Sequence, residues 1–329
     1  MCKFLRIPAL IAVAAALGIA STSLAQAPAQ APVKIRVGNL AFPSAVSIIL
    51  SIIKDKNFDR KHGIDLDMTA FGAISAFYGA FATGEVDSLV GGPLVFQRMR
   101  LEGVPIKIVG TLLDMTTISV ITKDPSIRSV TDLKGKTIAA DMGSAEYGVL
   151  LLYAKRKGLI LGKDVTVVQA GPPLVRTQLA ADRVDAGLIW EPTATLVMRD
   201  NPANRIIFNG KQGWHEMTGK DGWLLGFAAR EDWLAKNAAA LPRVIAALDE
   251  AARFARSNPD ESDRILQQSI KLPAGAFKEM ITAPRMAYQV RATMTDASAR
   301  ESLWEVIRIA AADGYFTEPV RDQSVIYAP

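Results

Sequence analysis

A short pattern occurs twice in this chain, and it limits the possible folds more than any other feature. Its first copy, residues 81–93, is FATGEVDSLVGGP, and its second copy, residues 179–192, is LAADRVDAGLIWEP. Each copy is typical of the end of a helix, a turn, and a short apolar strand that stops at a proline. Gly84 suits the position just after a helix, where a residue without a Cβ adopts positive φ easily. The repetition predicts two similar structural units in one chain.

The repeat extends to the strands that precede each copy. The strand candidates are residues 33–38, 64–69 and 86–90 in the first unit, and residues 137–141, 165–169 and 185–190 in the second. Helical patterns separate the strands, so each unit has the order βαβαβ. Two such units predict two α/β lobes. Open α/β sheets bind ligands beyond the carboxyl ends of their strands, and two such ends that face each other would form a cleft.

Two further apolar stretches indicate where the chain passes between the lobes. Residues 118–122 have the composition of a β-strand, and we expect them to carry the chain into a second lobe that spans residues 118–222. Residues 223–229 are a similar stretch, which we expect to return the chain to the first lobe. The first lobe would therefore combine residues 33–117 with residues 223–329.

The part of the chain after Glu231 has the spacing of helices. The predicted helices are residues 241–257, 262–271, 277–288 and 297–314. Pro259, Pro273 and Gly314 stand at or near their boundaries, as residues that interrupt helices should. We expect this helical C-terminal tail to pack on the first lobe, because it follows the second crossing.

The first 25 residues predict a signal peptide. Lys3 and Arg6 precede an apolar stretch at residues 7–20, and Ser23-Leu24-Ala25 has the small-x-small form of a cleavage site, with Ala25-Gln26-Ala27 as a second option. The alternative is a membrane anchor, but the apolar stretch is shorter than the ~20 residues of a membrane span. We therefore expect a tether at residues 26–32 and export of a soluble protein to the periplasm.

Cysteine content and charge exclude several classes of function. Cys2 precedes the apolar stretch, whereas a lipoprotein cysteine would follow it, so the exported chain would be no lipoprotein and would contain no disulfide or Cys-ligated metal. The formal net charge of +5 becomes +3 when the two charges of Lys3 and Arg6 are removed. That mild excess, without a long basic run, argues against nucleic-acid binding.

His62 and His215 are isolated, and no metal-binding or nucleophile motif is present, so we expect no catalytic site and no cofactor.

Taken together, several segments resemble the solute-binding proteins of ABC importers of the nitrate/sulfonate/taurine type, whose fold is like that of thiamine-pyrimidine synthases. The segments are GEVD at 84–87, GGP at 91–93, SVTDLKGK at 129–136, Gly143-Ser144 and WEP at 190–192. The resemblance implies a type II periplasmic-binding-protein fold, with two α/β lobes joined by two crossing strands and a helical C-terminal tail. It also implies a monomer that traps a small solute and delivers it to a membrane permease and its ATPase.

Candidate ligand contacts lie at the expected strand ends. Gly143 and Ser144 at a helix start would aim backbone N–H groups at an anionic or electron-rich ligand atom, although they also suit an ordinary turn and N-cap. Trp190 could stack on a flat ligand and Glu191 could accept hydrogen bonds from it. The alternative is that Trp190 fills space and Glu191 caps a helix. The predicted ligand-binding residues are Ser44, Gly72, Gly91, Gly92, Thr117, Gly143, Ser144, Glu146, Trp190, Glu191 and Trp223.

The acidic residues of the expected cleft distinguish this chain from the anion-binding members of the family that it resembles. Backbone amides favour anions, whereas Asp141, Glu146 and Glu191 favour amines or heterocycles with N–H groups. A zwitterion or a pyrimidine-like molecule would satisfy both, and a simple nitrate or sulfonate would not. Two other functions stay open: a sensor domain that passes its closure to a membrane kinase, and an enzyme like the pyrimidine synthases. The predicted export and the lack of cysteine argue against the enzyme.

Overall fold

The computed structural model describes Met1 and residues 31–328 of the 329 residues. The predicted signal peptide, apart from Met1, and most of the predicted tether therefore lie outside the described residues. Within the described part, none of the helices has both the length and the hydrophobicity that a membrane crossing requires.

The first lobe contains a six-stranded mixed sheet with the order β11-β4-β10-β3-β1-β2. Its strands are β1 (Val33–Leu40), β2 (Ile64–Phe71), β3 (Ser88–Gly91), β4 (Ile106–Asp114), β10 (Trp223–Arg230) and β11 (Tyr288–Ala292). Strands β1, β2 and β3 are parallel, whereas β10 runs antiparallel to both of its neighbours, β3 and β4. The first predicted βαβαβ unit is therefore one half of this sheet.

The second lobe contains a five-stranded mixed sheet with the order β7-β6-β8-β5-β9. Its strands are β5 (Ile118–Thr122), β6 (Thr137–Ala140), β7 (Thr166–Gln169), β8 (Ala186–Trp190) and β9 (Arg205–Asn209). The order β8-β6-β7 repeats the order β3-β1-β2 of the first lobe, with the first strand of the unit in the middle. The two copies of the sequence pattern thus occupy equivalent places in two sheets.

The chain passes between the sheets through two short connections rather than through strands. The first is the 3-10 helix η1 (Met115–Thr117), and the second is α8 (Gly210–Thr218) with the loop after it. Strand β5 pairs entirely within the second sheet and β10 entirely within the first. The two connections touch at Gly210, where an added Cβ would lie 2.6 Å from the Met115 carbonyl oxygen and from Ile118 Cβ.

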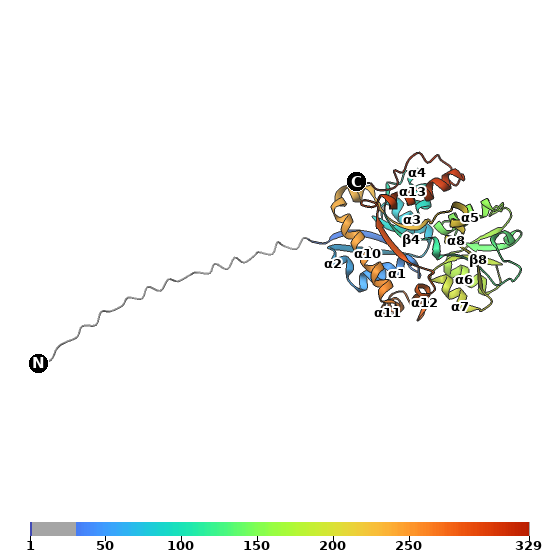
Figure 1. The fold of residues 1–329 in the computed structure, drawn as a ribbon, viewed down its shortest axis with the longest axis horizontal. Coiled ribbons are helices and arrows are strands. Elements are labelled where there is room, and N and C mark those ends of the chain that lie inside the picture. Colours follow the sequence, from blue (N-terminus) through green and yellow to red (C-terminus); the bar gives the residue numbers. More distant parts are fainter. Residues whose placement is uncertain (2–30, 329) are drawn as a thin grey trace. The chain divides into compact units, whose positions relative to one another are not determined.

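Helices cover both sheets (Figure 1). Those of the first lobe are α1 (Ala45–Asp55), α2 (Phe58–Lys61), α3 (Ile74–Thr83), α4 (Pro93–Leu101), α9 (Glu231–Asn237), α10 (Leu241–Ser257), α11 (Pro259–Ser269), α12 (Ala276–Thr282) and α13 (Ala297–Ala312). Those of the second lobe are α5 (Ala145–Arg156), α6 (Pro172–Ala180) and α7 (Thr193–Asp200). The late helix α10 packs on the early helices α1 and α2, so segments far apart in the sequence share one core (Figure 1).

The predicted helix at residues 277–288 is wrong in its second half. Helix α12 ends at Thr282, and β11 begins at Tyr288 and adds an edge strand beside β4. Pro284 explains the end of the helix, because proline has no N–H and its ring clashes with the preceding turn. Tyr288 is fully buried, and its hydroxyl donates a hydrogen bond of 2.7 Å to the carbonyl of Ala45.

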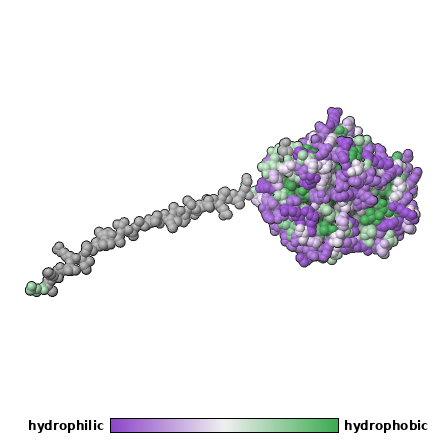
Figure 2. Space-filling view, viewed as in Figure 1, coloured by the Kyte–Doolittle hydropathy of each residue, from purple (hydrophilic) through white to green (hydrophobic). Residues whose placement is uncertain are grey.

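Hydrophilic residues dominate the molecular face drawn in Figure 2, where hydrophobic residues form only small separate patches. The large hydrophobic side chains are instead concentrated between the sheets and their helices. The strands β1, β3 and β4 and the helix α1 contribute many fully buried residues, such as Ile35, Leu89, Ile108 and Ile49. This rigid frame positions the ends of the strands that form the site described next.

Candidate functional site

A small buried cavity lies where the strand ends of the two sheets face each other. The first lobe contributes nine residues to its walls, and they come from the end of β1, the start of α1, the helix α3 and the strands β3 and β10. They are Leu40, Ser44, Ala45, Val46, Ile74, Phe77, Tyr78, Val90 and Leu225. The second lobe contributes Ser144, Ala145, Glu146 and Trp190, and the first connection contributes Thr117. A volume of about 30 Å³ inside it is wide enough for water, and it has room for one or two water molecules.

Two helix N-termini, one from each lobe, form part of the cavity wall. Helix α1 begins after Ser44, whose hydroxyl accepts a hydrogen bond from the Ser47 N–H at 3.1 Å. Helix α5 begins after Ser144, whose hydroxyl accepts a hydrogen bond from the Tyr147 N–H at 3.1 Å. Each cap satisfies one of the first N–H groups and leaves the others without a partner inside the helix. The positive ends of both helix dipoles therefore favour electron-rich atoms in this cavity.

Glu146 places a carboxyl group in the same wall. It lies in the first turn of α5 and is only 5 % exposed. Among the described residues no basic side chain forms an ion pair with it, and the nearby donors are its own N–H and the Ser144 side chain. Burial raises the pKa of Glu146 to about 7, and the charge of Asp141 acts in the same direction. Near neutral pH this group can therefore either accept or donate a hydrogen bond.

Aromatic rings form much of the remaining wall. Trp190 ends β8, is 5 % exposed and lies opposite Ile118 in the register of β5 and β8. The rings of Phe77 and Tyr78 pack edge to face with centroids 5.3 Å apart. Burial raises the pKa of the Tyr78 hydroxyl, and the charge of Glu146 adds to this effect. The wall thus combines rings, aliphatic groups and one acid, and among the residues that the structure describes no lysine, arginine or histidine lines it.

The structure brings five of the eleven predicted ligand-binding residues to this cavity. They are Ser44, Thr117, Ser144, Glu146 and Trp190. Two more, Gly72 and Gly143, line a more open depression of about 380 Å³ that shares Ile74 with the cavity. That depression also contains Asp141 and Gln169 and lies between loops of both lobes.

Gly91 and Gly92 lie behind the cavity wall rather than in it. A Cβ on Gly92 would lie 2.2 Å from the Ala145 Cβ, across the boundary between the lobes, and 3.2 Å from the Leu224 carbonyl oxygen. A Cβ on Gly91 would lie 2.7 Å from the Tyr78 hydroxyl. Both glycines are predicted ligand contacts, whereas in the structure the nearest neighbours of both are protein atoms.

Glu191 and Trp223 also point away from the cavity, contrary to the expected placement. The Glu191 carboxylate accepts hydrogen bonds from Arg285 Nε at 2.8 Å and from the Thr195 N–H at 3.1 Å. It therefore caps α7 and pairs with the first lobe, while burial raises the pKa of Glu191. The Trp223 indole N–H donates to the Ser302 hydroxyl on α13 at 2.8 Å. Glu191 therefore has the helix-capping role that was given as its alternative, and Trp223 packs against α13.

Sequence reasoning missed the contribution of α3. Ile74, Phe77 and Tyr78 all line the cavity, and their spacing of three and four residues places them on one helix face. That spacing was visible in the sequence, directly after Gly72. An apolar helix face most often belongs to the core, so this spacing alone does not indicate a cavity wall.

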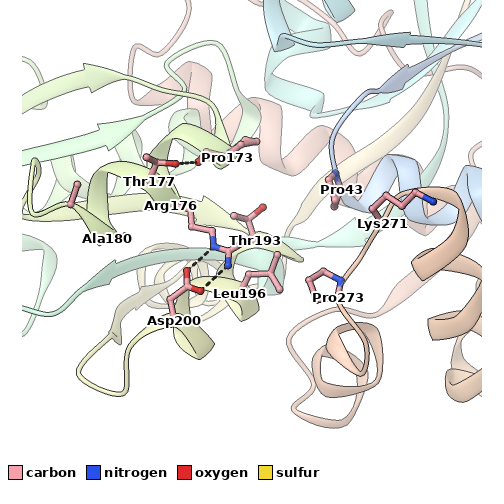
Figure 3. Close-up of a pocket in the computed structure, with 11 residues that line it drawn as sticks. Pro43, Pro173, Arg176, Thr177, Ala180, Thr193, Leu196, Asp200, Lys271 and Pro273 are labelled. Atoms are coloured by element: carbon pink, nitrogen blue, oxygen red, sulfur yellow. Dashed lines mark hydrogen bonds and ion pairs between the residues drawn. The ribbon is translucent and has the colours of Figure 1, made fainter.

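A wider groove lies on the surface beside the lobe boundary and contains none of the predicted residues. Its volume is about 660 Å³. Figure 3 shows Arg176 and Asp200 on one side of it and Pro43 and Lys271 on the other. Arg176 donates two hydrogen bonds, of 2.6 and 2.7 Å, to the carboxylate of Asp200. We therefore take the buried cavity, which both sheets and both helix N-termini surround, as the candidate site.

Two lobes with mixed sheets and a cavity between their strand ends define the fold of type II periplasmic binding proteins. The chain belongs to the NMT1/THI5-like family, whose model matches residues 46–262. It is similar to a protein of Brucella abortus (strain 2308) that is named as a binding protein, with 27% identity over 260 residues and 78% of each chain covered.

Solved structures share the fold over most of the chain. The alkanesulfonate-binding protein SsuA from Xanthomonas axonopodis pv. citri, bound to MOPS, has a TM-score of 0.74 and 20% identity, covering 91% of this chain and 99% of that chain. The periplasmic aliphatic sulphonate binding protein SsuA from Escherichia coli has a TM-score of 0.72 and 20% identity, covering 91% and 93%. Within the described residues, no group of three His, Cys, Asp or Glu side chains is arranged to hold a metal ion.

Proposed function

We propose that this protein is the periplasmic substrate-binding component of an ABC-type importer. It captures a small polar organic solute between its two lobes and delivers it, as a monomer, to a membrane permease and its ATPase. The observation that carries the proposal is the buried cavity to which both lobes contribute a helix N-terminus. The names of the binding proteins that resemble this chain support the same conclusion.

The size of the cavity implies movement. The space of about 30 Å³ has room for only one or two water molecules, so the walls would separate before an organic solute enters. Within the described residues the backbone crosses between the lobes at η1 and at the α8 segment, and short connections of this kind are suitable hinges. Binding would then consist of opening, capture and closure around the solute.

A stability screen followed by scattering tests the proposal. A true solute at a hundredfold excess over its Kd should stabilise the folded protein by about 2.7 kcal/mol, which a thermal-shift assay detects. Small-angle scattering should then give a smaller radius of gyration with the solute than without it. A screen of small polar solutes that yields no stabilisation, or a radius that is unchanged at saturation, would count against capture between the lobes.

A further inference from the structure

Within the described part of the chain, the walls of the candidate cavity include one acid and no base, and this imbalance limits the solutes that the cavity can hold. We propose that the protein selects a small solute that carries an N–H donor and has no net negative charge, and that Glu146 is the residue that selects it. Amides, amines and N-heterocycles belong to this class. The inference rests on the proposed function, because it names the kind of solute that the same cavity binds.

The first argument concerns polar groups that can take up further hydrogen bonds. Glu146 is 5 % exposed and Thr117 is 2 % exposed, and both line the cavity. Among the described residues, no cation pairs with the Glu146 carboxyl, whose nearby donors are its own N–H and the Ser144 side chain, and no hydrogen bond joins the Thr117 hydroxyl to another group. A carboxyl group has two oxygens and can accept more hydrogen bonds than these. A solute that donates to Glu146 and interacts with Thr117 would add to these contacts.

The second argument concerns charge. The N-termini of α1 and α5 favour an electron-rich atom, such as a carbonyl or sulfonyl oxygen. A permanently anionic solute would also lie against the Glu146 carboxylate, with Asp141 nearby. Arg98 is close enough to affect Tyr78 electrostatically, but it does not line the cavity. A neutral solute keeps the favourable contact with the helix ends and avoids the repulsion.

The third argument concerns shape. Phe77, Tyr78 and Trp190 present rings to the cavity, and Val46 and Val90 add aliphatic groups. Such a wall suits a compact apolar or flat body with few polar atoms. The sulfonate-binding structures that share this fold are 20% identical to the chain, so their ligand does not determine the ligand of this cavity.

Isosteric pairs of probes test the inference directly. Methanesulfonamide and methanesulfonate have almost the same shape, but only the sulfonamide is uncharged and carries N–H groups; acetamide and acetate form a second pair. At pH 8 we expect calorimetry to show at least tenfold tighter binding of the uncharged member to the wild type. Glu146→Gln should reduce or reverse this preference, and the exposed control Glu85→Gln should leave it unchanged.

The outcomes separate this inference from the proposed function. If methanesulfonate or acetate binds the wild type as tightly as its uncharged partner, and Glu146→Gln changes neither, the inference is overturned while solute capture stands. If no variant binds any of the four probes at millimolar concentration, and the wider thermal-shift screen finds no stabilising solute, the inference and the proposed function both fail. Circular dichroism of Glu146→Gln establishes that a changed preference arises in a folded protein.

Discussion

The carboxylate of Glu191 and the guanidinium of Arg285 meet at 2.8 Å, although the two residues belong to different lobes. Glu191 follows β8 of the second lobe, and Arg285 precedes β11 of the first. Arg285 also donates to the Thr195 hydroxyl at 2.7 Å and pairs with Glu279 at 3.0 Å. The result is a polar bridge between α7 and α12 beside the cavity.

Removal of Arg285 should destabilise the protein. Arg285→Met would leave Glu191, which is 1 % exposed, as a buried carboxyl without its cation. A fully buried pair costs ~3–5 kcal/mol when one partner is lost, and we expect about 2–3 kcal/mol here because Arg285 is partly exposed. Urea denaturation measures the loss. The double variant Arg285→Met/Glu191→Gln should recover part of it, and unchanged stability of the single variant would show that the bridge contributes nothing.

A side chain at position 92 should keep the lobes apart. In Gly92→Val the new Cβ would lie only 2.2 Å from the Ala145 Cβ, which is too close for two carbon atoms. Each lobe has its own sheet, so we expect both to stay folded, and with the solute found by the screen the radius of gyration should exceed that of the wild type with the same solute. The matched control is Gly79→Ala, because an added Cβ there meets no atom within 4 Å. An unchanged radius with a strongly reduced Tm would mean that the clash is absorbed inside one lobe.

Glu146 should make stability depend on pH in a defined direction. Its pKa rises from 4.5 to about 7 on folding, so between these values the folded state holds a proton that the unfolded state has lost. Stability therefore falls as pH rises through this window, by about 3 kcal/mol in total. Glu146→Gln removes this effect.

Denaturation curves at several pH values test the effect. Glu146→Gln should match the wild type below pH 4.5 and exceed it at pH 8, while Glu85→Gln should follow the wild type throughout. The other ionisable groups near Glu146 are Asp141 and Tyr78, and both remain in each variant. A constant difference between the wild type and Glu146→Gln at all pH values would contradict the raised pKa.

Trp190 should affect both binding and stability. It lines the cavity but is also buried among core residues. Trp190→Ala should cost about 3–5 kcal/mol of stability, and loss of the ring should weaken binding of the solute found by the screen by ~1–3 kcal/mol. Trp190→Phe should restore most of the stability. Normal affinity in Trp190→Ala would show that the ring serves the core alone.

Local sequence patterns predicted the strands well because alternation, glycine turns and prolines are signals carried by neighbouring residues. They failed at β11, where apolar spacing suggested a helix and Pro284 ended it early. They also misplaced Glu191 and Trp223, whose partners Arg285 and Ser302 are 94 and 79 residues away. Such pairings arise only when the two lobes and the C-terminal segments pack. The ligand-binding roles of Ser44, Thr117, Ser144, Glu146 and Trp190 stay predictions.

The position of β10 between β3 and β4 has a consequence for the newly made chain. The second sheet is built from one continuous stretch, whereas the first sheet needs strands from both sides of it. Until residue 230 has been synthesised, β3 lacks one neighbour and β4 lacks its neighbour β10, while its other neighbour, β11, comes later still. Unpaired strand edges of this kind are templates for aggregation, so we expect the first lobe to be completed only after the second and to be the part of the nascent chain most exposed to aggregation.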